Sequence, residues 1–122
     1  MKSPKNNKTN PRLLALIDEL KAVSRDNQVN IWQDIAARLE TSSRNYAEVN
    51  LSKISRYAAD GETILVPGKV LGSGVLETSV RVAALNFSQS ATDKIRGASG
   101  ECLSIEQLIR DNPKGSKIRI LR

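Results

Sequence analysis

Lysines and arginines recur beside small or turn-forming residues at several separated places in the chain. Lys8 lies near Asn10, Arg44 beside Asn45, Lys53 and Arg56 near Asn50 and Ser52, Lys69 beside Gly68, and Lys114 and Lys117 around Gly115 and Ser116. Cations and exposed backbone amides at turns suit the phosphates of structured RNA, which is recognised through shape, backbone and ribose hydroxyls. Single-strand stacking is disfavoured, because aromatic residues make up only 3% of the chain.

Pro67, Gly68 and Lys69 have two interpretations. A lysine directly after a glycine turn suits a phosphate, because the bare backbone lets the anion approach closely. The same three residues would serve equally as the corner of a hairpin. The local sequence leaves both interpretations open.

The positive charge is concentrated at the two ends of the sequence. The 122 residues contain 19 Lys and Arg against 13 Asp and Glu, a formal net charge of +6. Residues 1–12 and 114–122 contain no acid. Such segments keep their cations available to displace counterions from a phosphate chain, although a pair of solubilising tails would look the same. The acid-free segments hold Lys2, Lys5, Lys8 and Arg12, and Lys114, Lys117, Arg119 and Arg122.

Catalytic residues are hard to find in this sequence. Histidine is absent and the one cysteine, Cys102, cannot form a disulfide or a thiolate zinc site within the chain. Asp60 and Glu62 are the candidate ligands of a divalent ion for RNA cleavage, yet carboxylates beside turns are usually caps or solvated acids. We therefore expect no catalytic residue, no metal and no cofactor, and keep a metal-dependent RNA-processing enzyme as the alternative.

No stretch of the sequence is predicted to enter a membrane. An apolar run of about 18 to 20 residues would be needed to span one, and none occurs. The lysines near the N-terminus are not followed by the apolar segment of a signal peptide. We expect a cytoplasmic protein, in which Cys102 is a small apolar side chain.

The first half of the chain is predicted to be helical after a basic extended tail, residues 1–9. Asn10 and Pro11 start a first helix, which reaches a polar break at residues 24–28. Asn30 starts a second helix, with Trp32 on its apolar stripe and thus in the core. Residues 47–58 are predicted as a third helix, which ends before Gly61.

The period of the apolar residues changes near position 63. We expect a strand over 63–66, a turn at 67–68, a bent strand over 70–76 and a buried strand over 80–87. Ser88 caps a predicted helix over 90–96, and a capping box starts another over 105–111. A basic turn leads to a last strand over 117–121. The expected fold is α/β: one domain over 10–122, with a helical part at about 10–60 and an irregular α/β core at about 61–122.

Several motifs resemble one known family. The chain is similar to the archaeal and eukaryotic large-subunit ribosomal protein eighteen, the "eighteen-e" type, a relative of bacterial large-subunit protein fifteen. The resemblance begins near Thr9 and runs to the C-terminus. Its motifs are residues 47–54 (AEVNLSKI), 66–72 (VPGKVLG), 82–84 (VAA) with 87–88 (FS), and 112–116 (NPKGS).

The resemblance implies a structural role in the large subunit, in contact with ribosomal RNA and neighbouring ribosomal proteins, without a membrane or a small-molecule substrate. The compact length of the chain, without long extensions of the eukaryotic kind, suggests an archaeal source. A basic adaptor for an acidic protein is a further alternative. The RNA-facing positions that the resemblance implies are Lys8, Asn10, Arg12, Arg44, Asn50, Lys53, Arg56, Gly68, Lys69, Lys114, Gly115, Ser116 and Lys117, to which the charge distribution adds Lys2, Lys5 and Arg119.

Overall fold

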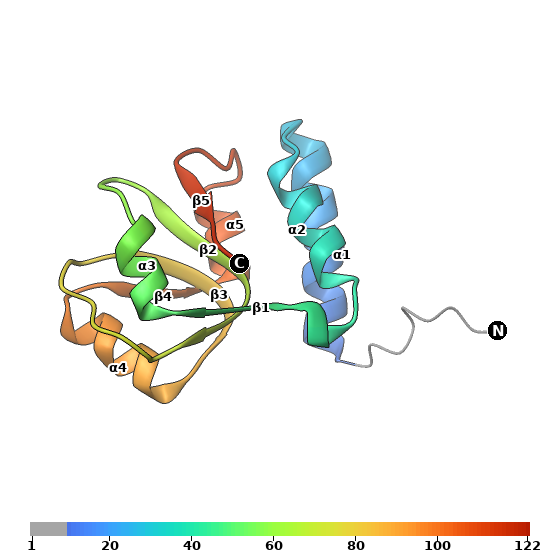
Figure 1. The fold of residues 1–122 in the computed structure, drawn as a ribbon. Helices are drawn as coiled ribbons and strands as arrows, with labels where there is room; N and C mark the ends of the chain where they lie inside the picture. Colours follow the sequence, from blue (N-terminus) through green and yellow to red (C-terminus); the bar gives the residue numbers. More distant parts are fainter. Residues whose placement is uncertain (1–9) are drawn as a thin grey trace.

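Helices cover both faces of a parallel sheet in the computed structural model, which describes residues 10–122 (Figure 1). The helices are α1 (Pro11–Asn27), α2 (Ile31–Leu39), α3 (Leu51–Tyr57), α4 (Gln89–Gly97) and α5 (Ile105–Asp111), with a short 3-10 helix, η2 (Ser43–Asn45). The strands are β1 (Ala47–Asn50), β2 (Thr63–Leu71), β3 (Arg81–Phe87), β4 (Glu101–Ser104) and β5 (Ile118–Ile120). The predicted α/β class is confirmed.

The sheet has the order β1-β2-β3-β4, and every neighbouring pair of strands is parallel. Because β3 occupies one edge of β2, both β1 and β5 lie along the other edge. The first residues of β2 pair with β5, in the register Thr63 with Ile118. The last residues pair with β1, in the register Val70 with Val49. The C-terminal strand therefore lies in line with the segment that precedes α3.

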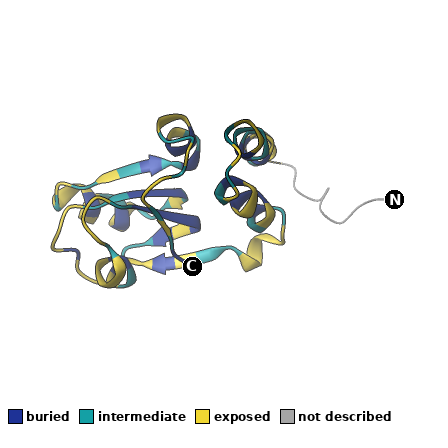
Figure 2. Cartoon of the chain, turned by 90° about the horizontal axis from the view of Figure 1, so that it is seen from above, coloured by how far each residue is buried: buried dark blue, intermediate teal, exposed yellow. Residues whose placement is uncertain are grey.

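Each face of the sheet carries its own apolar core, because side chains alternate along a strand. Leu65 and Ala83 pack with α1, α2 and α5, whereas Ile64 and Val82 pack with α3 and α4. The buried residues follow the strands in the view from above (Figure 2). Cys102 packs against the second core, as predicted for a small apolar side chain, and burial raises the pKa of its thiol. The molecule thus has three layers.

The α1–α2 hairpin differs from the prediction at one point. The polar segment 24–28 does not break α1, which continues to Asn27. Ser24 is buried and donates its hydroxyl to the carbonyl of Val29, so a polar residue is satisfied inside the hairpin. Trp32 is 0% exposed, which confirms its predicted place in the core.

Residues 47–58 were predicted as one helix, and the structure shows that this is wrong. β1 occupies 47–50, and α3 begins only at Leu51. Ala47, Val49 and Leu51 alternate, so this stretch also fits the period of a strand. Pairing with β2 decides in favour of a strand over a helix. Gly68 allows the two strands to approach, because a Cβ at Gly68 would lie 2.0 Å from the carbonyl oxygen of Ala47.

The predicted turn at 67–68 is also wrong, because β2 runs through it from Thr63 to Leu71. The register with β3 shifts between Val66 and Lys69, which places Pro67 in an irregularity of the strand. A proline has no N–H for the ladder and is tolerated at such a point. The hairpin-corner interpretation is thereby excluded, and the predicted bent strand over 70–76 ends at Leu71.

The C-terminal elements agree better with the sequence. β3, α4, α5 and β5 confirm the predictions over 80–87, 90–96, 105–111 and 117–121. The capping box of α5 is present: the Ser104 hydroxyl accepts from the Gln107 backbone N at 3.1 Å, and the Gln107 side chain accepts from the Ser104 backbone N at 2.9 Å. β4 was not predicted, because its four residues are too few to show a period.

Candidate RNA interface

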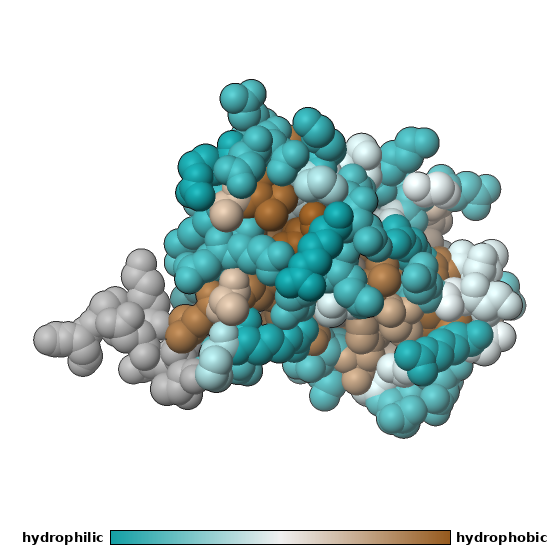
Figure 3. All heavy atoms as spheres, turned by 180° about the vertical axis from the view of Figure 1, so that it is seen from behind, coloured by the Kyte–Doolittle hydropathy of each residue, from teal (hydrophilic) through white to brown (hydrophobic). Residues whose placement is uncertain are grey.

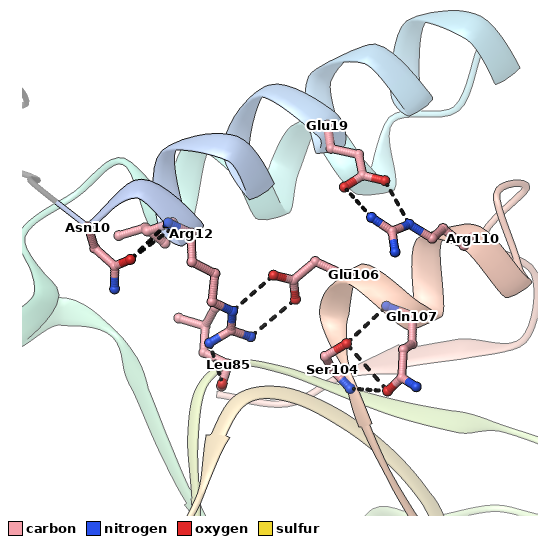
Figure 4. Close-up of polar contacts among 9 residues, drawn as sticks. Asn10, Arg12, Glu19, Leu85, Ser104, Glu106, Gln107 and Arg110 are labelled. Atoms are coloured by element: carbon pink, nitrogen blue, oxygen red, sulfur yellow. Dashed lines mark hydrogen bonds and ion pairs between the residues drawn. The ribbon is translucent and has the colours of Figure 1, made fainter.

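Asn10 and Arg12, two of the predicted RNA-facing residues, both have partners within the fold (Figure 4). Asn10 Oδ1 caps α1 by accepting from the backbone N of Arg12 at 2.9 Å. The Arg12 guanidinium donates to both carboxylate oxygens of Glu106, at 2.9 and 3.1 Å, and to the Leu85 carbonyl at 3.1 Å. Arg12 therefore joins α1 to α5 and β3, and its contact with RNA stays a prediction.

The two charges of this clamp stabilise each other. The hydrogen bond to Glu106 raises the pKa of Arg12. Burial alone would raise the pKa of Glu106, but the hydrogen bond from Arg12, a backbone hydrogen bond and the charges of Arg12 and Arg110 together outweigh it and lower this pKa below its usual value. A second clamp lies beside the first, since Arg110 donates to Glu19 at 3.2 and 3.4 Å. The α1–α2 hairpin is thus attached to α5 by paired charges.

Other basic residues have no Asp or Glu partner within residues 10–122, and we call these the unpaired cations. An ion pair neutralises a cation inside the protein, whereas an unpaired one keeps solvent counterions that a phosphate can displace. All but Lys53 are exposed. The unpaired cations are Arg25, Arg44, Lys53, Arg56, Lys69, Lys94, Arg96, Lys114, Lys117 and Arg122.

Three of the unpaired cations gather where α3 meets the end of the chain; we call Lys53, Arg56 and Arg122 the α3 group. Lys53 Nζ donates to the carbonyl oxygen of Arg122, which follows β5. Lys53 and Arg56 are three residues apart on α3, so their side chains lie on one side of the helix. The structure therefore brings together charges that are far apart in the sequence.

Arg119, a predicted site residue on β5, is already paired within the fold. Its guanidinium donates to Glu62 at 2.8 and 3.5 Å, and this hydrogen bond raises the pKa of Arg119. Glu62 is one of the two acids weighed for a metal site. Within residues 10–122 no group of three or more His, Cys, Asp or Glu residues could hold a metal ion.

A second set of predicted residues lies around β1. Arg44 belongs to η2, just before β1, and Asn50 is the last residue of that strand. Lys69 is the register partner of Glu48 and is exposed on an otherwise buried strand. Arg44, Asn50 and Lys69 are thus accessible to a ligand, whereas Gly68 has a structural role in the approach of β1 to β2.

The predicted basic turn is present between α5 and β5, and we call residues 113–117 the C-terminal turn. Lys114, Ser116 and Lys117 are exposed. Asn112 Nδ2 donates to the Ser116 carbonyl at 2.8 Å, and the backbone N of Gly115 donates to the Asn112 carbonyl at 3.0 Å. The turn therefore presents two lysines from a hydrogen-bonded backbone.

Sequence reasoning missed three of the unpaired cations: Arg25 in the last turn of α1, and Lys94 and Arg96 near the end of α4. A usable signal was present for Arg25 and Lys94, because neither has an acid three or four residues away in either direction, where a helical partner would lie; Asp93 lies three residues before Arg96. Lys2, Lys5 and Lys8 fall outside the described residues. None of the helices in the described part of the chain has the length and apolar character needed to cross a membrane.

Comparison with known proteins gives consistent matches over nearly the whole chain. Residues 1–122 match the family described as "Ribosomal protein 60S L18 and 50S L18e". The chain is 71% identical over 115 residues to the large ribosomal subunit protein eL18 of Methanoregula boonei, covering 94% of this chain and 95% of the relative. The eL18 of Methanospirillum hungatei is 64% identical over 118 residues, covering 97% and 98%. That of Halobacterium salinarum is 54% identical over 115 residues, covering 94% and 98%.

Proposed function

The chain belongs to the family of ribosomal proteins 60S L18 and 50S L18e, and we propose that it is a structural constituent of the large ribosomal subunit that binds and braces large-subunit rRNA. It acts in the cytoplasm as part of the ribosome, beside neighbouring ribosomal proteins. It is not an enzyme, and its contacts with RNA change the position of the RNA rather than its covalent structure.

The separation of paired and unpaired cations is the observation that supports this proposal. Arg12 and Arg110 are used in clamps between helices, as described above. The cations of the α3 group and of the C-terminal turn have no Asp or Glu partner among residues 10–122, although Lys53 also donates to the main-chain oxygen of Arg122. Figure 3 shows hydrophilic residues over much of the face opposite to that of Figure 1, with apolar side chains in patches between them. A phosphate chain can gain from the unpaired cations without breaking any of the protein's own ion pairs.

Bracing follows from where these groups are attached. The α3 group is joined to the end of β5, and the C-terminal turn is joined to its beginning, so one strand links the two. β5 pairs with the N-terminal part of β2, in the middle of the sheet. RNA segments bound at the two groups are therefore held at a fixed separation by the sheet.

The α3 group provides the test. We expect the double variant Lys53→Gln with Arg56→Gln to bind a large-subunit rRNA fragment more weakly, with its thermal unfolding midpoint nearly unchanged. The plot of log affinity against log salt should become less steep by about 1.5, at roughly 0.7 to 0.9 per lost phosphate contact. Binding is measured by titration at several salt concentrations.

The matched control is Lys21→Gln with Arg38→Gln, which removes the same charge from two paired cations. Equal losses of affinity in both double variants would show that only net charge matters and would contradict a site at α3. A site at α3 would also be contradicted if the double variant of Lys53 and Arg56 lost stability while its folded molecules bound RNA as the wild type does. Competition by an acidic protein but not by RNA would favour the adaptor alternative instead.

A further inference from the structure

Several hydrogen bonds hold the C-terminal turn in place, although it lies at the surface. Besides the two hydrogen bonds from Asn112 and Gly115 described above, the Lys117 carbonyl accepts from the backbone N of Thr63 at 2.9 Å. The turn is therefore tied at its end to the first residue of β2. Figure 1 shows it beside the tip of the α1–α2 hairpin.

Contacts with α2 fix the turn from the other side. The buried Trp32 donates its indole N–H to the Pro113 carbonyl at 2.8 Å. Gly115 lies against Ile31: its φ is +70°, and a Cβ at this position would be 2.6 Å from Ile31 Cγ2. Only glycine fits both the backbone angle and the close approach. The hairpin thus determines the position of a turn that is 81 residues away in the sequence from Trp32.

Lys117 has an unfavourable backbone conformation for its residue type. Its φ is +57°, in the left-handed region that glycine and asparagine adopt more readily. Backbone strain of this kind persists where the surrounding structure enforces it, and such residues gather at functional sites. A lysine at this position therefore lowers the stability of the fold. Such a cost is expected where the charge of the lysine contacts a ligand.

We propose that the C-terminal turn is a preformed contact for the phosphates of one rRNA backbone segment, with Lys114 and Lys117 as the contacting cations and Trp32 as a positioning residue. This inference rests on the proposed function and adds to it that α2 holds the turn in its binding conformation before RNA binds. A turn that is already ordered loses little conformational entropy on binding, so each lysine contributes more to affinity than it would on a mobile loop. No acid follows Asp111 in the sequence, and Asp111 itself is paired with Arg81.

Lys117→Asn tests the cost of the strained lysine. We expect its thermal unfolding midpoint to equal or exceed that of the wild type, because asparagine tolerates the left-handed region. Its affinity for the rRNA fragment should fall, and the salt dependence should become less steep by about 0.7 to 0.9. The matched control is Ser99→Asn. Ser99 lies between α4 and β4 with a φ of +63°, and this substitution should leave RNA binding unchanged.

Trp32→Phe tests the positioning role in a double-mutant cycle with Lys114→Gln. Phenylalanine keeps an aromatic ring in the core but removes the N–H that holds Pro113. We expect Lys114→Gln to cost less affinity in the Trp32→Phe background than in the wild type, with a coupling of about twofold or more. Tyr46→Phe is the control, because it removes a hydrogen bond of 2.6 Å to the Leu39 carbonyl at the other end of α2.

If Trp32→Phe does not fold, Asn112→Ala takes its place in the cycle. Asn112→Ala removes the hydrogen bond from Asn112 to the Ser116 carbonyl at the surface. Additive losses in the cycle, or wild-type binding by Lys117→Asn, would overturn the inference. Binding of the rRNA fragment by the wild type distinguishes this result from a failure of the proposed function. If the wild type does not bind the rRNA fragment, the proposed function fails; if it binds and the variants behave like it, only the preformed turn is refuted.

Discussion

Arg119 and Lys117 are two residues apart on the same segment, yet of these two only Arg119 has a carboxylate partner among residues 10–122. Arg119 projects from β5 toward Glu62, which precedes the first residue of β2, whereas Lys117 lies in the turn before the strand. The position of a residue relative to the sheet, rather than its charge, therefore determines whether it is available to a ligand. Glu62 thus neutralises the one cation of β5, the strand that joins the C-terminal turn to the α3 group.

Glu62→Gln should release Arg119 to RNA. We expect tighter binding of the rRNA fragment and a salt dependence that is steeper by about 0.7 to 0.9, which corresponds to one more phosphate contact. Salt titration of the variant measures both quantities. Glu77→Gln removes the same charge from an exposed acid in the loop after β2, so identical behaviour of the two variants would contradict a specific role for Glu62.

Residue types alone could show where cations accumulate but not which of them are paired. The partners Arg12 and Glu106 are 94 residues apart in the sequence, and Arg119 and Glu62 are 57 apart. Such pairs depend on the order of strands in the sheet, which no local pattern contains. The left-handed backbone at Lys117 was equally hidden, because lysine is not a residue that predicts it.

Among the elements, the α1–α2 hairpin depends most on specific polar contacts. It lies over one face of the sheet and is attached to α5 by the Arg12–Glu106 and Glu19–Arg110 pairs (Figure 4). These pairs supplement the apolar contacts of the first core. They fix α1, the partner of α2 in the hairpin, and α2 positions the C-terminal turn through Trp32.

Glu106→Gln should lower the free energy of unfolding near neutral pH by about 1 kcal/mol, a modest value because Arg12 is 43% exposed. The pKa of Glu106 is lower in the folded chain, so its contribution is complete above the ordinary glutamate pKa of about 4.3 and is lost as the pH falls through the folded value. The difference between variant and wild type should therefore shrink below about pH 4.

Denaturant titrations of both proteins from pH 7 to pH 3 measure this difference. Asp34→Asn breaks an exposed pair one helical turn apart and should cost only about 0.3 to 0.5 kcal/mol at neutral pH. A difference for Glu106→Gln that is zero at pH 7, or that grows on acidification, would show that the clamp does not stabilise the fold.

Helices were predicted better than strands for an identifiable physical reason. The starts of α1 and α5 are marked by local capping residues, Asn10 and Ser104, which act within a few residues of the chain. β1 and the middle of β2 depend on each other, because the Gly68 backbone is adjacent to Ala47. A strand whose pairing is non-local and whose register is irregular has no comparable mark in the sequence.

On the scale of the whole molecule, the parallel sheet is the frame that holds the unpaired cations apart. β5 connects the C-terminal turn to the α3 group, while β1 carries Asn50 and is preceded by Arg44. The sequence was enough to predict the α/β class and the basic ends, because composition and capping are local properties. It could not predict this arrangement, since the joining of β1 and β5 to the same strand brings together residues from both halves of the chain.

The salt dependence of binding to a large-subunit rRNA fragment tests most directly whether several cations neutralise phosphates at once. With about six to eight phosphates neutralised, log affinity should fall against log salt with a slope of roughly −4 to −7. A slope near zero, with binding retained, would contradict the account, because contacts that release no counterions cannot depend on the unpaired cations described here.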